Sequence, residues 1–157
     1  MKDAPAPAAA PAPAAPPAPE AADYRLDDQV GYLLRLASQR HVAIFQDLAD
    51  HGLTPTQFAA LMRLSELGRA SQNDLGRRTG LDAATIKGVV GRLAAKGLLA
   101  TAPDPDDRRR SVLTLTAAGL ALARRAARFG QAVSAATLAP LAPAERDRFL
   151  SYLRRLT

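Results

Sequence analysis

The chain has no cysteine among its 157 residues. This absence excludes disulfide bonds, thiol-based redox sensing and zinc sites with cysteine ligands. No apolar run reaches the roughly 18 residues that indicate a membrane-spanning helix. The N-terminus also lacks the basic region and apolar core of a secretory signal. We therefore expect a soluble cytoplasmic protein with no membrane partner.

The residue patterns of enzymes and cofactor sites are missing too. We find no set of nucleophile, base and acid, no glycine loop that would cradle a phosphate and no internal repeat. The nearest approach to a metal-ligand cluster is His41, Asp47, Asp50 and His51. Only some of these share a helix face, and no His-x-x-x-His pair occurs, so we expect no metal site. We predict a protein that is not an enzyme and uses no cofactor.

Positive charge and an N-terminal tract of alanine and proline are what the chain has in excess. The formal net charge is +6 and the isoelectric point is near 10.5, which indicates a polyanionic partner. Residues 1–22 hold seven of the twelve prolines. This composition cannot bury enough apolar surface to offset its ordering entropy, so we expect a disordered or polyproline II tail. The tail is either a dispensable extension or a docking segment for a partner.

Residues 23–157 are predicted to form a single, mainly helical domain. The spacing of apolar residues and the positions of capping residues predict six helices. They are 25–49, 55–67 opened by Thr54-Pro55, a short helix between the Ser71 cap and Gly80, a helix from the Asp82 cap to Gly97, 117–138 after the Thr116 cap, and 144–156. Two strands, 98–102 and 110–115, complete the order α-α-α-α-β-β-α-α. This order predicts a winged helix-turn-helix fold with a small β-wing.

The two short helices in the middle of the chain are joined through Gly80, at a length that suits the bend of a helix-turn-helix. The second of them is then expected to lie in the major groove of DNA. Its apolar residues, Ile86, Val90 and Leu93, are expected to face the core. The opposite, outer side then carries small residues and one lysine: Ala84, Lys87, Gly88, Gly91 and Ala95. Thr85 and Arg92 lie on the flank of that side.

Gly88 and Gly91 each cost about 1 kcal/mol relative to alanine in a helix interior. Their position on the outer side is explained either by close approach to DNA or by tertiary packing that overrides helix propensity. Lys87 can pair with phosphate or with guanine edges. Arg92 can do the same, and Arg77 and Arg78 on the preceding helix are expected to contact phosphate. Each of these arginines can instead be a simple solvated charge.

An acidic and then basic turn connects the two predicted strands. Its prolines and aspartates favour a tight bend, and three arginines follow at residues 108–110. An arginine inserted into a narrow minor groove responds to the width of that groove. Arg109 is our candidate for this role, braced by Asp107, while Arg108 and Arg110 contact phosphate or brace the turn. The alternative is an ordinary charged hairpin.

Together these motifs resemble the MarR family of bacterial transcription regulators. The resemblance covers residues 25–157 and is carried by Leu53-Thr54-Pro55-Thr56-Gln57-Phe58, Asn73-Asp74-Leu75, Leu81 to Ile86, Arg92 to Leu99, Asp107-Arg108-Arg109 and Leu115-Thr116-Ala117-Ala118-Gly119. It implies a homodimer with an interface of N- and C-terminal helices, residues 25–50 and 117–157, and a DNA-binding lobe at 53–116. It also implies binding to palindromic operators, usually as a repressor that a small aromatic acid releases.

A narrower resemblance, to the regulators of nicotinate degradation, implies a hydroxylated nicotinic acid as effector. It is carried by Leu26 to Arg35, Ser38 to Phe45, Ser71-Gln72-Asn73 and Ala84 to Val90. His41 lies on the apolar stripe of the first helix, with Arg40 beside it. An imidazole can donate to or accept from an aromatic acid, and a guanidinium can clamp its carboxylate. The alternative for His41 is a core histidine with a satisfied hydrogen bond.

The sequence thus predicts a ligand-responsive regulator whose partners are double-stranded DNA, a second copy of itself and a small aromatic carboxylic acid. The alternative is a winged-helix module for protein–protein interaction that does not touch DNA. The candidate effector-binding residues are Arg40, His41, Ile44 and Phe45. The candidate DNA-binding residues are Ser71, Gln72, Arg77, Arg78, Ala84, Thr85, Lys87, Gly88, Gly91, Arg92, Asp107, Arg108, Arg109 and Arg110.

Overall fold

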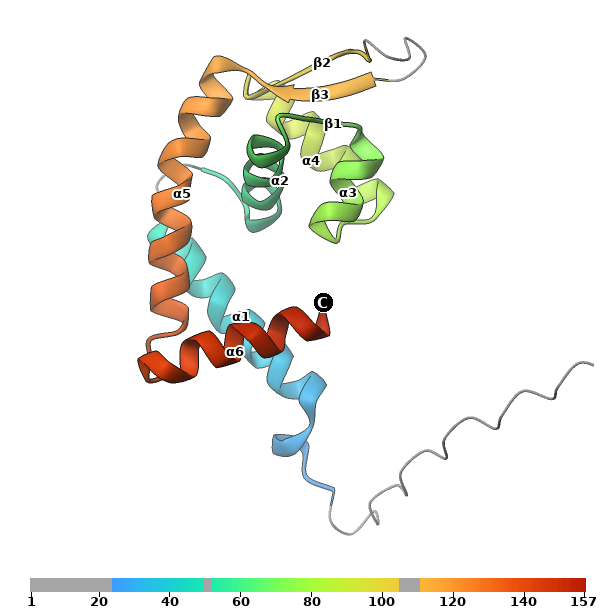
Figure 1. Cartoon of the computed structure of the whole chain (residues 1–157). Coiled ribbons are helices and arrows are strands. Elements are labelled where there is room, and N and C mark those ends of the chain that lie inside the picture. The colour runs from blue at the N-terminus through green and yellow to red at the C-terminus, as the bar shows by residue number, and fades with distance from the viewer. Residues whose placement is uncertain (1–23, 50–51, 105–110) are drawn as a thin grey trace, which may run out of the picture. The chain divides into compact units, whose positions relative to one another are not determined.

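The computed structural model describes residues 24–49, 52–104 and 111–157 (Figure 1). These described residues fall into two compact units, one that ends at Arg35 and one that begins at Leu36. The first unit contains the 3-10 helix η2 (Leu26–Asp28) and the beginning of α1 (Val30–Leu48). The single predicted helix over 25–49 is therefore interrupted at Gln29, which is extended at φ −80° and ψ 120°. Its side chain accepts a hydrogen bond from the backbone N–H of Tyr32 and so caps α1.

The second unit contains the rest of α1, five further helices and one small sheet. The helices are α2 (Pro55–Leu67), α3 (Gln72–Thr79), α4 (Ala83–Ala95), α5 (Ala117–Thr137) and α6 (Pro143–Leu156). The strands are β1 (Arg69–Ala70), β2 (Leu99–Pro103) and β3 (Ser111–Leu115), in the antiparallel order β1-β3-β2. The predicted winged helix-turn-helix fold is confirmed. None of the helices within the described ranges is long and apolar enough to cross a membrane.

One strand was missing from the predicted order. β1 is only two residues long and pairs with β3 through Arg69 opposite Thr114 and Ala70 opposite Leu113. Two residues show no periodicity, and their partner strand is distant in sequence, so no local pattern marked them. In the wing itself, Leu99 lies opposite Leu115 and Pro103 opposite Ser111, close to the predicted strand bounds.

The helix starts follow the predicted caps. The side chains of Thr54, Ser71, Asp82 and Thr116 each accept a hydrogen bond from the backbone N–H three residues later. Each bond satisfies a backbone donor that has no partner inside its helix. α6 begins one residue earlier than predicted, with Pro143 at a first-turn position that suits proline.

The core lies where α2, α3, α4 and the sheet meet. Its largest fully buried side chains are Leu61, Leu64, Leu75, Ile86, Val89 and Leu93. Burial of each leucine or isoleucine contributes about 1.5 to 3 kcal/mol relative to exposure. This packing holds α3 and α4 at a fixed angle and turns the opposite face of α4 to solvent.

Candidate functional site

The turn between α3 and α4 has the close backbone approach of a helix-turn-helix. Gly80 ends α3 in the left-handed conformation, with φ 66°, where glycine avoids the steric cost of a side chain. The backbone N–H of Leu81 donates to the Gly76 carbonyl at 2.9 Å. A Cβ on Gly76 would lie 3.1 Å from the Leu81 carbonyl oxygen and 3.2 Å from Cγ2 of Ile86. A glycine at this position therefore lets α3 lie directly against the turn and α4.

The outer face of α4 carries the residues that the sequence placed there. Ile86, Val89, Val90 and Leu93 are buried, as expected for the core side. Ala84, Lys87, Gly91 and Arg92 are exposed, and Thr85 and Gly88 are half-buried.

The two glycines on the outer side of α4 have room for a side chain. A Cβ on Gly91 would meet no atom within 4 Å, and the nearest atoms to one on Gly88 would be those of the Arg92 guanidinium, at 3.5 Å or more. Packing among the described residues therefore does not require glycine at either position. The buried face of α4 can still offset the low helix propensity of the two glycines, so both explanations offered by the sequence remain open.

Thr85 and Asp82 form a closed pair at the start of α4. The backbone N–H and the hydroxyl of Thr85 donate to the two oxygens of Asp82, each at 2.8 Å. These hydrogen bonds lower the pKa of the exposed Asp82 carboxyl below its ordinary value of 3.8. In this structure the Thr85 hydroxyl hydrogen is thus engaged in capping α4.

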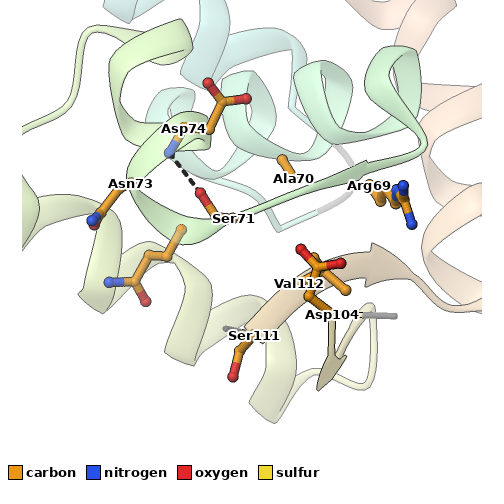
Figure 2. Close-up of a pocket in the computed structure, with 9 residues that line it drawn as sticks. Arg69, Ala70, Ser71, Asn73, Asp74, Asp104, Ser111 and Val112 are labelled. Carbon is orange, nitrogen blue, oxygen red and sulfur yellow. Dashed lines mark hydrogen bonds between the residues drawn. The ribbon is translucent and has the colours of Figure 1, made fainter. Parts of the chain in front are cut away.

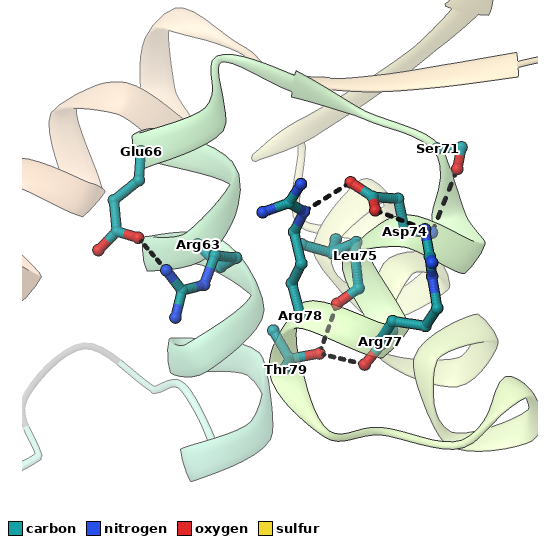
Figure 3. Close-up of polar contacts among 9 residues, drawn as sticks. Arg63, Glu66, Ser71, Asp74, Leu75, Arg77, Arg78 and Thr79 are labelled. Atoms are coloured by element: carbon teal, nitrogen blue, oxygen red, sulfur yellow. Dashed lines mark hydrogen bonds and ion pairs between the residues drawn. The ribbon is translucent and has the colours of Figure 1, made fainter. Parts of the chain in front are cut away.

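Arg77 and Arg78, the predicted phosphate contacts of α3, share one carboxylate (Figure 3). Nη2 of Arg77 lies 2.8 Å from Oδ1 of Asp74, and Nε of Arg78 lies 2.8 Å from Oδ2. The spacing of three and four residues brings these side chains together on one helix face, which sequence analysis did not use. Exposed ion pairs contribute about 0 to 1 kcal/mol, so a phosphate can compete for these arginines.

Arg78 also lines a hollow between α2 and α3. The other lining residues are Ala59, Met62, Arg63, Glu66 and Thr79. Nη1 of Arg63 donates to Glu66 at 2.6 Å, and Arg78 pairs with Asp74, so both arginines that line this hollow have an acidic partner (Figure 3). Arg78 therefore borders the space between α2 and α3 while its guanidinium pairs with Asp74 of its own helix.

A larger polar hollow, of about 700 Å³, lies between the beginning of α3 and the wing strands (Figure 2). Ser71 and Gln72, both predicted to bind DNA, are half-buried in its lining together with Asp104 and Ser111. The Ser71 hydroxyl accepts from the backbone N–H of Asp74 at 3.2 Å. The wing residues Asp107, Arg108, Arg109 and Arg110 lie outside the described residues.

The candidate effector residues lie where α1 meets the end of α5. Nη1 of Arg40 donates to the Thr137 carbonyl at 2.7 Å, and Nη2 to the Ala136 carbonyl at 3.3 Å. The Thr137 hydroxyl gives its hydrogen to the Val133 carbonyl at 2.8 Å and contacts Nδ1 of His41 at 2.9 Å. Because that hydrogen is already used, Nδ1 of His41 must be the donor, and Nε2 remains for another partner.

An aromatic cluster, defined here as Phe45, Phe58 and Phe129, lies beside these residues. Its ring centroids are 4.8 to 5.7 Å apart and its rings meet edge to face, which is an arrangement that aromatic pairs prefer. A Cβ on Gly130 would lie 2.8 Å from Cζ of Phe58, so glycine makes room for that ring. Phe45 is only 3% exposed, so it supports the site from inside, while Ile44 is half-buried.

Sequence analysis missed several residues of this second site. Phe58, Phe129, Gly130 and Thr137 come from α2 and α5, far in sequence from His41. A signal was available in the scarcity of aromatics, because three of the four phenylalanines meet here. Among the described residues no three histidine, aspartate or glutamate side chains gather as metal ligands. Asp50 and His51 lie outside that part of the chain.

Known proteins with similar sequences are transcription regulators. A model of the MarR family matches residues 51–110. The HTH-type transcriptional repressor NicR of Pseudomonas putida is 42% identical over 134 residues, which cover 85% of each chain. These residues include the helix-turn-helix and the wing strands described above.

Solved structures with a similar fold lead to the same group of proteins. A probable transcriptional regulator from Pseudomonas aeruginosa is 47% identical, with a TM-score of 0.82, over 85% of this chain and 100% of the other. Bordetella bronchiseptica BpsR, whose DNA binding is regulated by 6-hydroxynicotinic acid, is 43% identical. Its TM-score is 0.80 over 85% of this chain and 96% of BpsR.

Proposed function

Because this chain belongs to the MarR family of transcriptional regulators, we propose that it represses transcription by binding operator DNA as a homodimer. A small aromatic acid releases it. The observation that carries this proposal is the exposed face of α4, where Lys87 and Arg92 lie beside Gly88 and beside Gly91, which has open space above it. Its relatives are regulators and not enzymes.

DNA binding follows from placing α4 in the major groove. A groove about 12 Å wide admits one helix, and the small residues Gly88 and Gly91 let the helix backbone approach the base edges. Lys87 and Arg92 then reach phosphates or guanines on either side of the helix. Arg109, on the wing, enters the adjacent minor groove, and Ser71 and Gln72 contact the backbone near the beginning of α3.

Dimer formation is supported by apolar side chains that the single chain leaves in water. On α6, Phe149 and Tyr152 are 40% and 54% exposed, and Leu156 is 72% exposed. On the part of α1 in the first unit, Leu33 and Leu34 are about half exposed. Exposed apolar surface of this kind marks interaction sites. A two-fold dimer would set its two recognition helices about 34 Å apart, one turn of DNA.

A hydroxylated nicotinic acid is the effector that we propose, by analogy with BpsR. The free Nε2 of His41 meets a hydroxyl or carboxylate of the ligand, and the aromatic cluster lies beneath the ring. Arg40 exchanges the backbone carbonyls at the end of α5 for the ligand carboxylate. The ligand lowers DNA affinity only to the extent that it binds the DNA-free arrangement more tightly.

The experiment that tests this function is a titration of the full chain against DNA from upstream of its own gene. Fluorescence anisotropy is measured between about 50 and 200 mM salt, with and without 6-hydroxynicotinic acid and with benzoate as the control ligand. We expect log K to fall linearly with log salt, as phosphate contacts require, and the hydroxylated acid to weaken binding. Absence of binding at low salt favours the protein–protein interaction module instead.

A further inference from the structure

The C-terminal end of α4 is bonded to the first turn of α5. The Thr116 hydroxyl donates to the Gly97 carbonyl at 2.7 Å, and the Thr116 backbone N–H donates to the Leu98 carbonyl at 3.1 Å. The same hydroxyl accepts from the backbone N–H of Gly119 at 3.1 Å. The Thr116 side chain therefore caps α5 and also bonds it to the segment that follows α4.

The contact is close enough to require glycine. A Cβ on Gly119 would collide with the carbonyl oxygen of Leu98, which is backbone and cannot move aside. Gly119 is buried. The Leu-Thr-x-x-Gly motif thus has a geometric cause: Thr116 supplies the bond and Gly119 supplies the space for it.

Thr116 differs in this respect from a cap of the same residue type. Thr54 caps α2 by accepting from Gln57 N–H at 3.3 Å, and its hydroxyl otherwise contacts Thr56 within the same turn, at 3.1 Å. Across the described ranges, Thr116 is the cap whose hydroxyl also bonds to the backbone beyond its own helix. The two threonines share one capping role and differ in the bond between elements.

The bond from Thr116 to Gly97 lies just beyond the C-terminal end of α4, the proposed recognition helix. α4 has 13 residues and is therefore about 20 Å long. A tilt of about 10° at its C-terminal end would move its N-terminal end by about 3 Å. Hydrogen bonds to bases tolerate only a few tenths of an ångström, so an α4 that tilts freely spends less time in the arrangement that fits DNA.

We propose that Thr116 is a positioning residue for DNA binding, whose hydroxyl fixes the angle of α4 relative to α5. This inference rests on the proposed function. Thr116 is not among the residues that we assign to DNA contact. Its loss should instead lower the fraction of protein that is competent to bind and raise the apparent Kd in proportion. The salt dependence of binding, which counts phosphate contacts, stays the same.

The test compares four full-length proteins by anisotropy and thermal unfolding: wild type, Thr116→Val, Thr116→Ser and Thr54→Val. Thr116→Val removes the hydroxyl at nearly constant volume, and we expect Kd to rise roughly threefold to tenfold, the range for one lost hydrogen bond. Thr116→Ser keeps the hydroxyl and should stay within about twofold of wild type. Thr54→Val loses a cap of the same type and should lower Tm without changing Kd or the salt slope.

Thr116→Asp is tested in parallel, in case Thr116→Val does not fold. A carboxylate caps α5 by accepting from Gly119 N–H, but it cannot donate to Gly97, so we expect a folded protein with weakened binding. Wild-type affinity in Thr116→Asp or Thr116→Val would overturn the inference, as would a reduced salt slope. Loss of DNA binding by wild type itself would instead overturn the proposed function.

Discussion

His41 uses one ring nitrogen inside the protein, and the other has no partner among the described residues. This division follows from the Thr137 hydroxyl, whose hydrogen goes to Val133 and whose lone pair receives Nδ1–H. The half-buried ring is therefore oriented before any ligand arrives, so its Nε2 is presented at low entropic cost. The two interpretations of His41 from sequence, a satisfied histidine and a ligand contact, are thus compatible with each other.

We predict that His41→Asn keeps DNA binding and loses most of the response to effector. The asparagine amide can replace Nδ1 as donor to Thr137 but has no group in place of Nε2. In the anisotropy assay, Kd without ligand should stay within about twofold of wild type, and the effector concentration for half-release should rise about tenfold or more. Thr137→Val removes only the partner that orients Nδ1 and keeps Nε2, so it should raise that concentration less than His41→Asn does. An undiminished response in His41→Asn would remove this residue from the ligand site.

The Asp82 carboxylate gives α4 a stability that depends on pH. Its folded-state pKa is lowered, first by the backbone and then by the hydroxyl hydrogen bond of Thr85. A lowered folded pKa means that its contribution is complete above the unfolded value near 3.8 and is lost as pH falls through the folded value. We predict that Asp82→Asn, which keeps a cap without the charge, has a lower Tm than wild type at pH 7. The gap should close as pH falls below 4; a constant gap by circular dichroism would contradict this.

At the scale of elements, the sequence predicts what is bonded locally and misses what is bonded across the chain. Ser71, Asp82 and Thr116 were identified as caps because each acts on a residue three positions away. β1 and the bond between His41 and Thr137 were not, because their partners lie about 45 and 96 residues away along the chain. Separations of this size leave no periodicity to detect.

The candidate DNA-binding helix was predicted in more detail than the candidate effector site for the same reason. The buried and exposed faces of α4 follow from one helical period within a single segment. The effector candidates instead depend on rings and hydroxyls from α1, α2 and α5. The candidates that the sequence did supply, Arg40, His41, Ile44 and Phe45, all come from one short segment of α1.

On the exposed face of α4, we predict one substitution that raises the stability of the protein and weakens its binding to DNA. Gly91→Ala fills open space, so it should raise the free energy of unfolding by about 1 kcal/mol through helix propensity alone. The added methyl group occupies space that we assign to DNA, and binding should weaken by about 1 to 2 kcal/mol, roughly fivefold to thirtyfold. Thermal unfolding and anisotropy measure the two effects on the same sample.

The control for Gly91→Ala is a substitution of alanine by glycine at an exposed position on another helix. Ala132→Gly on α5 should lower stability by about 1 kcal/mol and leave Kd unchanged. Tighter or equal DNA binding by Gly91→Ala would show that the outer face of α4 does not lie against a duplex.

At the scale of the whole molecule, the single chain leaves its C-terminal helix incompletely covered. Phe149 and Tyr152 of α6, with Leu141, line a shallow hollow that is mainly apolar. Neither α6 nor any of its residues contributes to the buried core cluster. In the dimer that we propose, this α6 surface meets a second copy, and DNA binding by two recognition helices depends on that contact.

We therefore predict that Phe149→Glu converts the dimer into monomers and weakens operator binding at least a hundredfold. A charge placed in an apolar interface pays a desolvation cost of several kcal/mol per buried ion, and a monomer keeps only one recognition helix. Ser151→Glu adds the same charge at an exposed position on the other side of α6 and should leave both properties unchanged. Sedimentation velocity gives the oligomeric state and anisotropy gives the affinity. A Phe149→Glu variant that stays dimeric would place the interface elsewhere, whereas a monomer that binds operator like wild type would refute the two-helix model of recognition.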